Sequence, residues 1–201
     1  MILENKLNIT NQIELAKAEE KISKQKAKAL YDSNDIAKVE VGTFSGLSFI
    51  HSYLFEDIYD FAGIIRDVNI SKGDFRFAPV MYLKQSLKYI DTMPQGNFDE
   101  IIEKYVEMNI AHPFREGNGR ATRIWLDLML KNEIKQVIDW NMVDKDDYLL
   151  AMQRSVIKDI EIKFILKEAL TDQIDNRTLF MKGIDISYYY EGYSEFKTDE
   201  L

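Results

Sequence analysis

One twelve-residue segment, HPFREGNGRATR at 112–123, concentrates residue types that handle charged groups. Its two glycines, Gly117 and Gly119, flank Asn118 and predict a tight turn that leaves backbone N–H groups free at the start of the next helix. Such N–H groups, together with the positive end of the helix dipole, form an anion site suited to phosphate. The segment therefore predicts a phosphate cradle.

Two arginines, Arg120 and Arg123, fall in the first turn of that helix, three residues apart and on one face. Cations at a helix N-terminus oppose the dipole and are usually disfavoured there. The segment 112–123 has three arginines against one glutamate, a local excess of positive charge in a chain whose formal net charge is −8. We expect a polyanion to lie between these arginines and the loop.

Two further side chains complete a reactive set. Glu116, beside the loop, is a candidate ligand for Mg²⁺, which favours one or two carboxylates plus substrate phosphates. His112 has an ordinary pKa of about 6.5, so part of it is neutral at cellular pH and can accept a proton from a hydroxyl. Cradle, carboxylate, arginines and base together indicate transfer of a phosphorus-centred group.

The composition excludes other chemistry. The 201 residues contain no cysteine, which excludes a thiol nucleophile, a disulfide scaffold and a thiolate zinc site, and two histidines argue against a multi-histidine metal cage. The acidic net charge argues against a nucleic-acid partner. With no signal-peptide pattern and no long apolar run, we expect a cytoplasmic protein without a membrane partner. His51, on an apolar helix face, is expected to be buried and hydrogen-bonded.

The apolar residues recur mostly with helical period, which predicts an all-α fold in a single domain spanning 1–201. A first helix begins after Asn11, and the helix near 118–132 is apolar nearly all round, so it should be the central one. The polar segment 193–201 is expected to be loosely held. The face of the first helix expected to be buried carries Ile13, Leu15, Ala18, Ile22, Ala29 and Leu30. Further helices are expected at about 43–61, 79–93, 98–111, 118–132, 144–154, 158–170 and 184–191.

The segment 67–77 breaks the helical period. Val68 and Ile70 alternate with polar neighbours, the residues at 71–74 predict a turn, and Phe77 ends a second alternating run. We interpret it as a β-hairpin whose exposed edge aligns an extended peptide by main-chain hydrogen bonds; a gap-filling connector is the alternative. The residues expected to dock such a peptide are Asn69, Ile70, Ser71, Lys72, Gly73 and Phe75.

The segment 183–196, GIDISYYYEGYSEF, holds a second anomaly. Ser187 and Glu191 lie four residues apart on one helical face, and Gly192 follows as a C-terminal stop. A carboxylate in a last turn faces the negative end of the dipole, so it either has a cationic partner or is simply solvated. The arginines of 112–123 are the complementary charges.

The segment HPFREGNGRATR matches in full the motif of the Fic family, His-any-Phe-any-Asp/Glu-Gly-Asn-Gly-Arg-any-any-Arg. The upstream run IHSYLFEDIYDFAGIIR resembles the Fic-core helix that leads to the family's hairpin. The resemblance implies a compact helical core at about 11–170 with a hairpin flap at about 67–77. It also implies a protein adenylyltransferase that moves AMP from ATP to a Ser, Thr or Tyr hydroxyl of a target protein.

The resemblance also assigns roles to the motif residues. It makes His112 the general base on the target hydroxyl and Phe114 the anchor of the loop. Glu116 would hold the divalent metal, Mg²⁺ or alternatively Ca²⁺ or Mn²⁺. The remaining assignments are phosphate binding by Gly117, Asn118 and Gly119, and pairing with the β- and γ-phosphates by Arg120 and Arg123.

The pattern Ser-any-any-any-Glu-Gly at 187–192 resembles the inhibitory helix of the class III Fic proteins. There the glutamate pairs with the second arginine of the motif, here Arg123, and blocks the productive pose of the γ-phosphate. We therefore expect Glu191 to restrain AMP transfer. Tyr188, a core aromatic by default, is the candidate for a self-modification that loosens this helix at about 184–191.

Two other readings of the function stay open. In one, Glu191 and a metal-bound water remove AMP from a modified protein, and Ca²⁺ or Mg²⁺ biases the direction. In the other, the chain is a non-catalytic nucleotide-binding regulatory or antitoxin-like module. No pattern in the sequence indicates which nucleotide base is preferred or which protein is the target. The long amphipathic first helix is compatible with a homo-oligomer.

Overall fold

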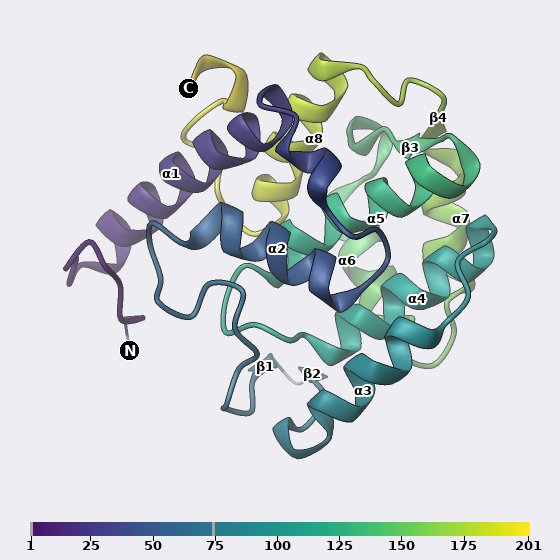
Figure 1. Ribbon diagram of the computed structural model, residues 1–201, viewed down its shortest axis with the longest axis horizontal. Helices are drawn as coiled ribbons and strands as arrows, with labels where there is room; N and C mark the ends of the chain where they lie inside the picture. Colours follow the sequence, from purple (N-terminus) through teal and green to yellow (C-terminus); the bar gives the residue numbers. More distant parts are fainter. Residues whose placement is uncertain (1, 74) are drawn as a thin grey trace.

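The computed structural model of the chain describes residues 2–73 and 75–201, and in this part the fold is mainly helical (Figure 1). Two small sheets of two strands each accompany the helices, which confirms the expected all-α class with a hairpin. The helices are α1 (Gln12–Asp32), α2 (Phe44–Phe55), α3 (Val80–Thr92), α4 (Phe98–Ala111), α5 (Asn118–Ile134), α6 (Lys145–Arg154), α7 (Ile160–Glu168) and α8 (Arg177–Tyr190). Short 3₁₀ turns are η1 (Asp35–Lys38), η2 (Trp140–Met142) and η3 (Thr198–Glu200).

Helix α5 is the central helix, as its apolar sequence predicts. It packs against α2, α4 and α8 and crosses the middle of the molecule (Figure 1). Trp125 and Leu126 are fully buried, and the Trp125 indole N–H donates to the carbonyl of Thr43 at the start of α2, at 3.0 Å. The loop at 112–117 thus leads directly into the central, buried helix of the fold, which holds it in position.

The hairpin consists of β1 (Ser71–Lys72) and β2 (Phe75–Arg76), antiparallel and close to the start of α3 (Figure 1). Ser71 pairs with Arg76 and Lys72 with Phe75. The turn expected at 71–74 was therefore placed too early, because Ser71 and Lys72 belong to the strand. Asp74, the last residue of that expected turn, lies outside the described residues.

Two helix boundaries lie far from the expected ones, and one sheet was not expected. Helix α2 ends at Phe55 rather than near 61, because the chain turns where Ile58 and Tyr59 both donate to the Phe55 carbonyl. Helix α8 begins at Arg177 rather than near 184, because the Asn176 side chain accepts from the N–H of Leu179 and caps it. A second sheet, β3 (Val137–Ile138) with β4 (Leu170–Thr171), has no counterpart among the expected elements.

The buried face of α1 is more polar than its sequence predicts. Ile13 is 70% exposed, whereas Glu19, Glu20 and Lys24 are buried. Lys24 lies 3.0 Å from Glu20, so burial of these charges is matched by pairing. The expectation of an apolar face running through Ile13 and Ala29 was wrong, since the neighbours of α1 supply polar partners.

The segment 193–201 is also held more firmly than expected. Lys24 donates to the carbonyl of Phe196, and the Glu20 carboxylate accepts from the backbone N–H groups of Glu195 and Phe196. The C-terminus accordingly lies beside α1 (Figure 1). These partly buried hydrogen bonds hold the tail in place, so the expectation of a loosely held tail was wrong.

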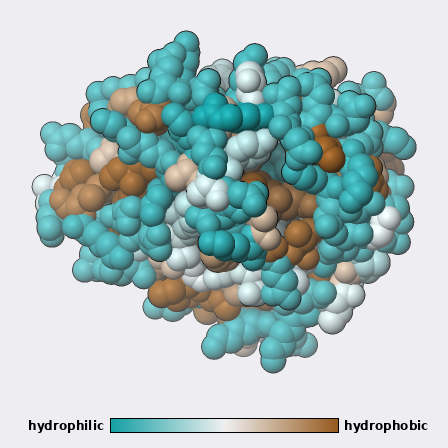
Figure 2. Space-filling view, turned by 45° about the horizontal axis from the view of Figure 1, so that its top comes forward, coloured by the Kyte–Doolittle hydropathy of each residue, from teal (hydrophilic) through white to brown (hydrophobic). Residues whose placement is uncertain are grey.

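The molecular surface is hydrophilic over most of the face in Figure 2, with hydrophobic side chains gathered in a few separate patches. Among the helices of residues 2–73 and 75–201, none combines the length and apolar character that crossing a bilayer requires.

Candidate active site

The loop between α4 and α5 is closed by its own asparagine. The Phe114 backbone N–H donates to Oδ1 of Asn118 at 2.9 Å, and Nδ2 of Asn118 donates to the Phe114 carbonyl at 2.8 Å. Asn118 is buried, so both of its amide groups are used in shaping the loop. Its side chain fixes the backbone, and phosphate binding by this residue would use its main-chain N–H.

The loop is supported from beneath by α2. His51 is fully buried and stacks on Phe114 with ring centroids 3.8 Å apart. Its Nδ1 accepts from the Gly63 N–H and its Nε2 donates to the Glu116 carbonyl, each at 2.8 Å. Burial lowers the pKa of His51 to about 4. As expected, His51 is a buried, hydrogen-bonded histidine.

The N-terminus of α5 differs from those of α1, α4, α6 and α8, which Asn or Asp side chains cap. Its N-cap is Gly117 at φ 78°, and within the described residues no side chain caps it. A Cβ at Gly117 would lie 2.5 Å from the ring of Phe55, so only glycine fits this turn. The first-turn N–H groups therefore face outward as an anion site.

A cavity of about 640 Å³ lies over this helix end. Four basic side chains and two carboxylates line it, a balance that favours an anionic ligand. Its lining comes from the hairpin segment (Ile70, Ser71, Lys72, Phe75, Phe77), the loop and α5 (His112, Arg115, Glu116, Gly117, Asn118, Gly119, Arg120, Arg123), Asn109, α6 (Tyr148, Leu149, Met152, Gln153), Glu191 and Tyr193.

His112 ends α4 and presents its imidazole to this cavity. It adopts the left-handed region at φ 48°, ψ 64°, and its ring stacks on Phe77 with centroids 3.6 Å apart. Nδ1 lies 3.3 Å from the Asn109 carbonyl, which places the proton on Nδ1 and leaves Nε2 as an acceptor. Burial lowers the pKa of His112 to about 3, and the charges of Arg66 and Lys72 act in the same direction. The imidazole is therefore neutral, as a general base must be.

Arg123 is paired with the C-terminal end of α8. Its Nε donates to Oγ of Ser187 at 2.7 Å, and its Nη2 donates to the Ser187 carbonyl at 2.9 Å and to Oε1 of Glu191 at 2.8 Å. Burial favours the neutral form of Glu191, but the charges of Arg123 and Lys72 outweigh it and hold the pKa at about 2. Glu191 is ionised and lies at the arginine expected from the sequence.

The Glu191 carboxylate also contacts the hairpin and the α5 terminus. Its Oε2 lies 3.2 Å from Nζ of Lys72 on β1. A Cβ placed on Gly119 would lie 2.4 Å from Oε1, so the carboxylate rests directly against the first turn of α5. The Glu191 carboxylate thus occupies part of the anion site at the start of α5, which an anionic ligand would otherwise fill.

Arg120 forms its ion pairs with Glu19 of α1 and with Glu116, and not with Glu191. It is buried, with Nη1 2.5 Å from Oε1 of Glu19 and Nη2 3.0 Å from Oε1 of Glu116. Its guanidinium also lies over the rings of Phe55, Tyr188 and Tyr193. Pairing of Arg120 with a phosphate stays a prediction, since its present partners are carboxylates.

Glu116 is placed to hold a divalent cation together with a ligand. Its side chain is 42% exposed, and among the described residues hydrogen bonds from Gly117 and Arg120 reach only its Oε1. Across residues 2–73 and 75–201 no three potential ligating side chains cluster as a metal cage. A single accessible carboxylate at an anion site fits Mg²⁺, which is commonly held by one or two carboxylates and substrate phosphates.

Tyr188 faces the interior in this conformation. It is 1% exposed, and its hydroxyl has no hydrogen-bond partner among the described residues. Burial, outweighing the nearby Arg120 charge, raises the pKa of Tyr188 to about 12. Modification of this hydroxyl would require α8 to leave its place first.

The hairpin residues expected to dock a peptide divide into two groups. Ile70, Ser71, Lys72 and Phe75 line the cavity. Asn69 instead accepts the N–H of Val80 with its Oδ1 and supports the start of α3. Gly73 lies exposed at the hairpin tip, away from the cavity lining.

Sequence reasoning missed Glu19 and Arg66, and it recognised only part of what Lys72 does. Glu19 was left out of the expected buried face of α1, although its spacing of four from Leu15 and from the buried Ser23 indicates one shared face. Lys72 was treated as a docking residue only, and its pairing with Glu191 joins segments far apart in the chain. Arg66 carried no signal beyond its place at the end of an apolar run, yet it is 2% exposed.

Comparison with known proteins agrees with this geometry. The Fic/DOC family model matches residues 43–130. A protein of Escherichia coli K12 named "Probable protein adenylyltransferase Fic" is 29% identical over 174 residues, which cover 79% of this chain and 82% of that protein. "Protein adenylyltransferase VbhT" of Bartonella schoenbuchensis is 31% identical over 142 residues, 64% of this chain and 29% of that protein.

Solved structures show the same fold. The Fic domain of Bep8 from Bartonella sp. 1-1C has a TM-score of 0.71 at 20% identity and covers 86% of this chain and 92% of that one. BepC from Bartonella tribocorum, solved with bound AMPPNP, has a TM-score of 0.68 at 20% identity and covers 86% and 94%. The motif and the family model agree that residues 43–130 match the Fic/DOC family, and the solved Fic-domain structures share the fold of this chain.

Proposed function

We propose that this protein is a nucleotidyltransferase that moves AMP from ATP to a hydroxyl group of a target protein. One observation carries the proposal: a neutral His112 and the uncapped N-terminus of α5 open into the same cavity. The names of relatives such as the Escherichia coli protein support ATP as donor and a protein as acceptor. The proposal treats residues 1–201 as one functional unit, with the flap at 67–77 and the regulatory end of α8 as parts of it.

In the proposed reaction His112 acts on the acceptor. Its Nε2 takes the proton of a Ser, Thr or Tyr hydroxyl while that oxygen forms a bond to the α-phosphorus of ATP. The bond from the α-phosphorus to the β-bridging oxygen breaks, and pyrophosphate leaves. Because the imidazole is already neutral and Nδ1 is oriented by Asn109, the base needs no prior deprotonation.

The phosphates are proposed to bind at the start of α5. The N–H groups of the loop at 117–119 and the helix dipole favour negative charge there. Arg123 would pair with the terminal phosphate after Glu191 leaves, and Arg120 through the Nη2 that now bonds Glu116. A Mg²⁺ ion held by Glu116 would neutralise charge on the polyphosphate.

The hairpin is proposed to align the target. An extended segment adding to the β1–β2 hairpin would place its hydroxyl near His112, because Phe77, which follows β2, stacks directly on that imidazole. Main-chain pairing fixes the depth of the target segment without reading much of its sequence. The target class is therefore a flexible segment carrying a hydroxyl side chain.

Glu191 is proposed to restrain this activity. Its carboxylate pairs with Arg123 and lies against Gly119, where a phosphate oxygen would bind. Two anions do not share such a site, so ATP binds productively only when α8 releases the carboxylate. Ser187 strengthens the restraint, because it engages Arg123 through both its hydroxyl and its carbonyl.

The test compares wild type, His112→Ala and Glu191→Gly with labelled ATP, CTP, GTP or UTP in cell lysate, with Mg²⁺ or Ca²⁺. We expect ATP-dependent labelling to rise in Glu191→Gly and to fall by about 10²- to 10⁴-fold when His112→Ala is added. Glu195→Gly, which removes a half-exposed carboxylate paired with Lys17, is the matched control and should behave as wild type. Equal labelling with and without His112 would reject the enzyme and favour a non-catalytic module.

A second activity, removal of AMP from a modified protein, is favoured by one observation. Glu191 is ionised and lines the same cavity as His112, so it can take a proton from water there once it leaves Arg123. Incubation of an AMP-modified target with wild type and Glu191→Gln distinguishes the directions. Loss of AMP with wild type alone would support removal, and no loss with either would leave transfer as the activity.

Self-modification is proposed at Tyr188. After incubation of wild type and Tyr188→Phe with ATP, mass spectrometry of the segment 183–196 should find AMP in the wild type alone. Because the hydroxyl is buried, the modification should be faster in Glu191→Gly, whose α8 is less firmly held. Equal modification of Tyr188→Phe would reject this site.

A further inference from the structure

Arg66 is a buried arginine whose partners are all main-chain carbonyls. It is 2% exposed, and no carboxylate pairs with it within the part of the chain that the structure describes. Its guanidinium donates from Nε to His112 (2.8 Å), from Nη1 to Val68 (2.7 Å), and from Nη2 to Ala78 (2.6 Å) and Ala111 (3.1 Å). Burying a charged group without an oppositely charged partner costs free energy, so the burial of Arg66 indicates a role other than stabilising the fold.

The carbonyls on one side belong to the end of α4. Ala111 is the last residue of that helix and His112 is its C-cap, and the final carbonyls of a helix have no partners within it. His112 adopts the left-handed region, which is sparsely populated for residues other than glycine. Arg66 supports this conformation through its side chain, which donates to the His112 carbonyl. It also does so through its backbone N–H, which donates to the Pro113 carbonyl at 2.8 Å. The orientation of the imidazole thus depends on Arg66.

The carbonyls on the other side belong to the two stems of the hairpin. Val68 precedes β1 and Ala78 follows β2, so one guanidinium joins both stems. The Ala78 N–H donates to the Ile110 carbonyl of α4 at 3.0 Å and reinforces the same junction. Because a guanidinium is planar and rigid, it fixes these carbonyls relative to one another in a way that a lysine ammonium does not.

We propose that Arg66 is a positioning residue, which sets the distance between the base His112 and the hairpin edge that receives the target hydroxyl. The inference rests on the proposed AMP transfer. Arg66 does not contact the first turn of α5, where the phosphates are proposed to bind. Its loss should therefore affect the chemical step and leave ATP binding nearly intact, because a displacement of about 1 Å between reacting groups costs on the order of 10²-fold in rate.

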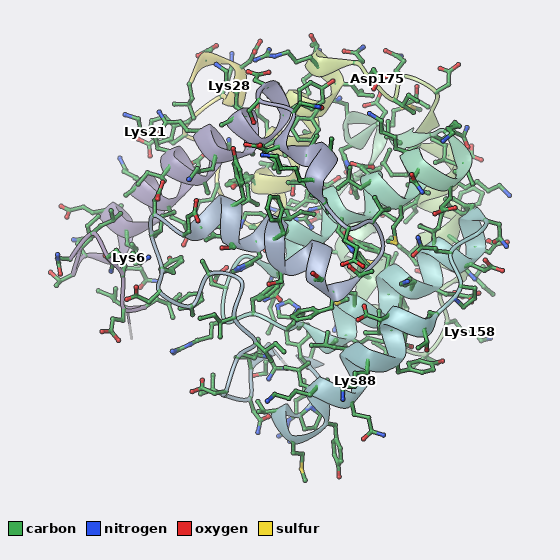
Figure 3. The ribbon with its side chains drawn as sticks, viewed as in Figure 1. Lys6, Lys21, Lys28, Lys88, Lys158 and Asp175 are labelled. Atoms are coloured by element: carbon green, nitrogen blue, oxygen red, sulfur yellow. The ribbon has the colours of Figure 1, made fainter. Side chains whose placement is uncertain are left out.

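The experiment uses the full chain in the Glu191→Gly background, with Arg66→Lys and Arg66→Met added separately. We expect kcat for target labelling to fall by about 10²-fold in both variants, with KM for ATP within about twofold of the parent. Lys158→Met is the control, because Lys158 is exposed at the edge of the molecule (Figure 3) and is not among the residues that line the cavity. If Arg66→Met does not fold, Arg66→Lys, which retains the charge and most of the side chain, takes its place.

Imidazole NMR supplies a readout that does not need turnover. The chain has two histidines, and His51 serves as the internal reference because it lies beneath the loop without contacting Arg66. We expect the Nδ1–H signal of His112 to broaden or vanish in both Arg66 variants while the His51 signals stay in place. A general loss of stability would disturb both histidines alike.

The outcomes separate the two proposals. If Glu191→Gly itself labels no target, AMP transfer is wrong, whereas an altered His112 signal would still show that Arg66 orients this ring. If Glu191→Gly labels the target and its Arg66→Lys derivative labels it equally fast with an unchanged His112 signal, the positioning role is overturned and AMP transfer stands.

Discussion

Arg120 and Arg123 lie one turn apart on α5, and each is paired with a glutamate from a different helix. Arg120 meets Glu19 of α1, and both side chains are almost completely buried. Arg123 meets Glu191 at the end of α8, where the carboxylate is 21% exposed and also reaches Lys72 of the hairpin. Two similar ion pairs are thus embedded to different depths.

The difference in depth separates a fixed pair from one that can open. Glu19 is held by Arg120, Tyr59 and Tyr193 in the middle of a helix, so removing its carboxylate would mean displacing α1. Glu191 follows the last turn of α8, and Gly192 at φ 92° comes next. Accordingly, the Glu191 carboxylate is expected to separate from Arg123 more easily than Glu19 separates from Arg120. We therefore expect the first pair to govern stability and the second to govern activity.

The largest effect is expected from Glu19→Gln. It leaves the buried Arg120 without its main counter-charge, so the free energy of unfolding should fall by about 3–5 kcal/mol. Urea unfolding measures this, with Glu14→Gln in the exposed first turn of α1 as the control. A loss below about 1 kcal/mol, or a rise in labelling comparable to that of Glu191→Gly, would erase the distinction between the two pairs.

Glu191→Gln should show the opposite balance. Labelling of target by ATP should rise by roughly 5- to 150-fold, the usual range of a regulatory coupling, because Arg123 becomes available to phosphate. The free energy of unfolding should fall less than in Glu19→Gln, since Arg123 keeps both of its bonds to Ser187. Initial labelling rates and urea unfolding on the same preparations test this, and a larger stability loss than Glu19→Gln would reverse the assignment.

The ion pair between Glu191 and Arg123 should affect how the free energy of unfolding depends on pH. The pKa of Glu191 is lowered from 4.5 to about 2 in the folded protein, so the ionised group stabilises the fold above pH 4.5. That contribution is lost as the pH falls from 4.5 toward about 2. Over this window the unfolding free energy of wild type should drop more steeply than that of Glu191→Gln. Parallel curves in urea titrations would show that Glu191 gains nothing from Arg123.

The smallest effect is expected from Lys72→Met. The Lys72 side chain is 67% exposed, and exposed ion pairs contribute about 0.2–1 kcal/mol, so labelling should rise by about 1.4- to 5-fold. Added salt should reduce the difference from wild type, because it screens the same pair. Lys88→Met, an exposed lysine on α3, is the control. An increase as large as that of Glu191→Gln would make the hairpin, rather than Arg123, the main anchor of the carboxylate.

The site was predictable from sequence where its parts are local. His112, Glu116 and the glycines lie within one contiguous segment, so their types and spacing alone indicate an anion loop with a base. The pairing of Glu191 with Arg123 was also expected: the disfavoured position of each charge indicated a possible pair, and the resemblance to the class III Fic proteins implied Arg123 as the partner. Helix ends and motif spacings are local properties, which a single sequence displays directly.

Long-range partners were the part that sequence could not supply. The pattern of α1 left Glu19 out of the buried face, because hydropathy does not reveal that a distant residue, Arg120, pairs with it. Arg66 was missed for a related reason: its partners are main-chain carbonyls, which exist at every position and leave no trace in side-chain patterns. The tail at 193–201 was misjudged likewise, since Lys24 and Glu20 bind its backbone.

The ring closed by Asn118 has a consequence for the thermodynamics of nucleotide binding. Because its amide already joins both polar groups of the Phe114 backbone, the loop has its final shape before any ligand arrives. Ligand binding then orders no flexible segment, and the entropic penalty usual for glycine-rich loops is largely absent. The Asn118 side chain thus orders the loop during folding. We therefore expect ATP to bind a loop that is already rigid.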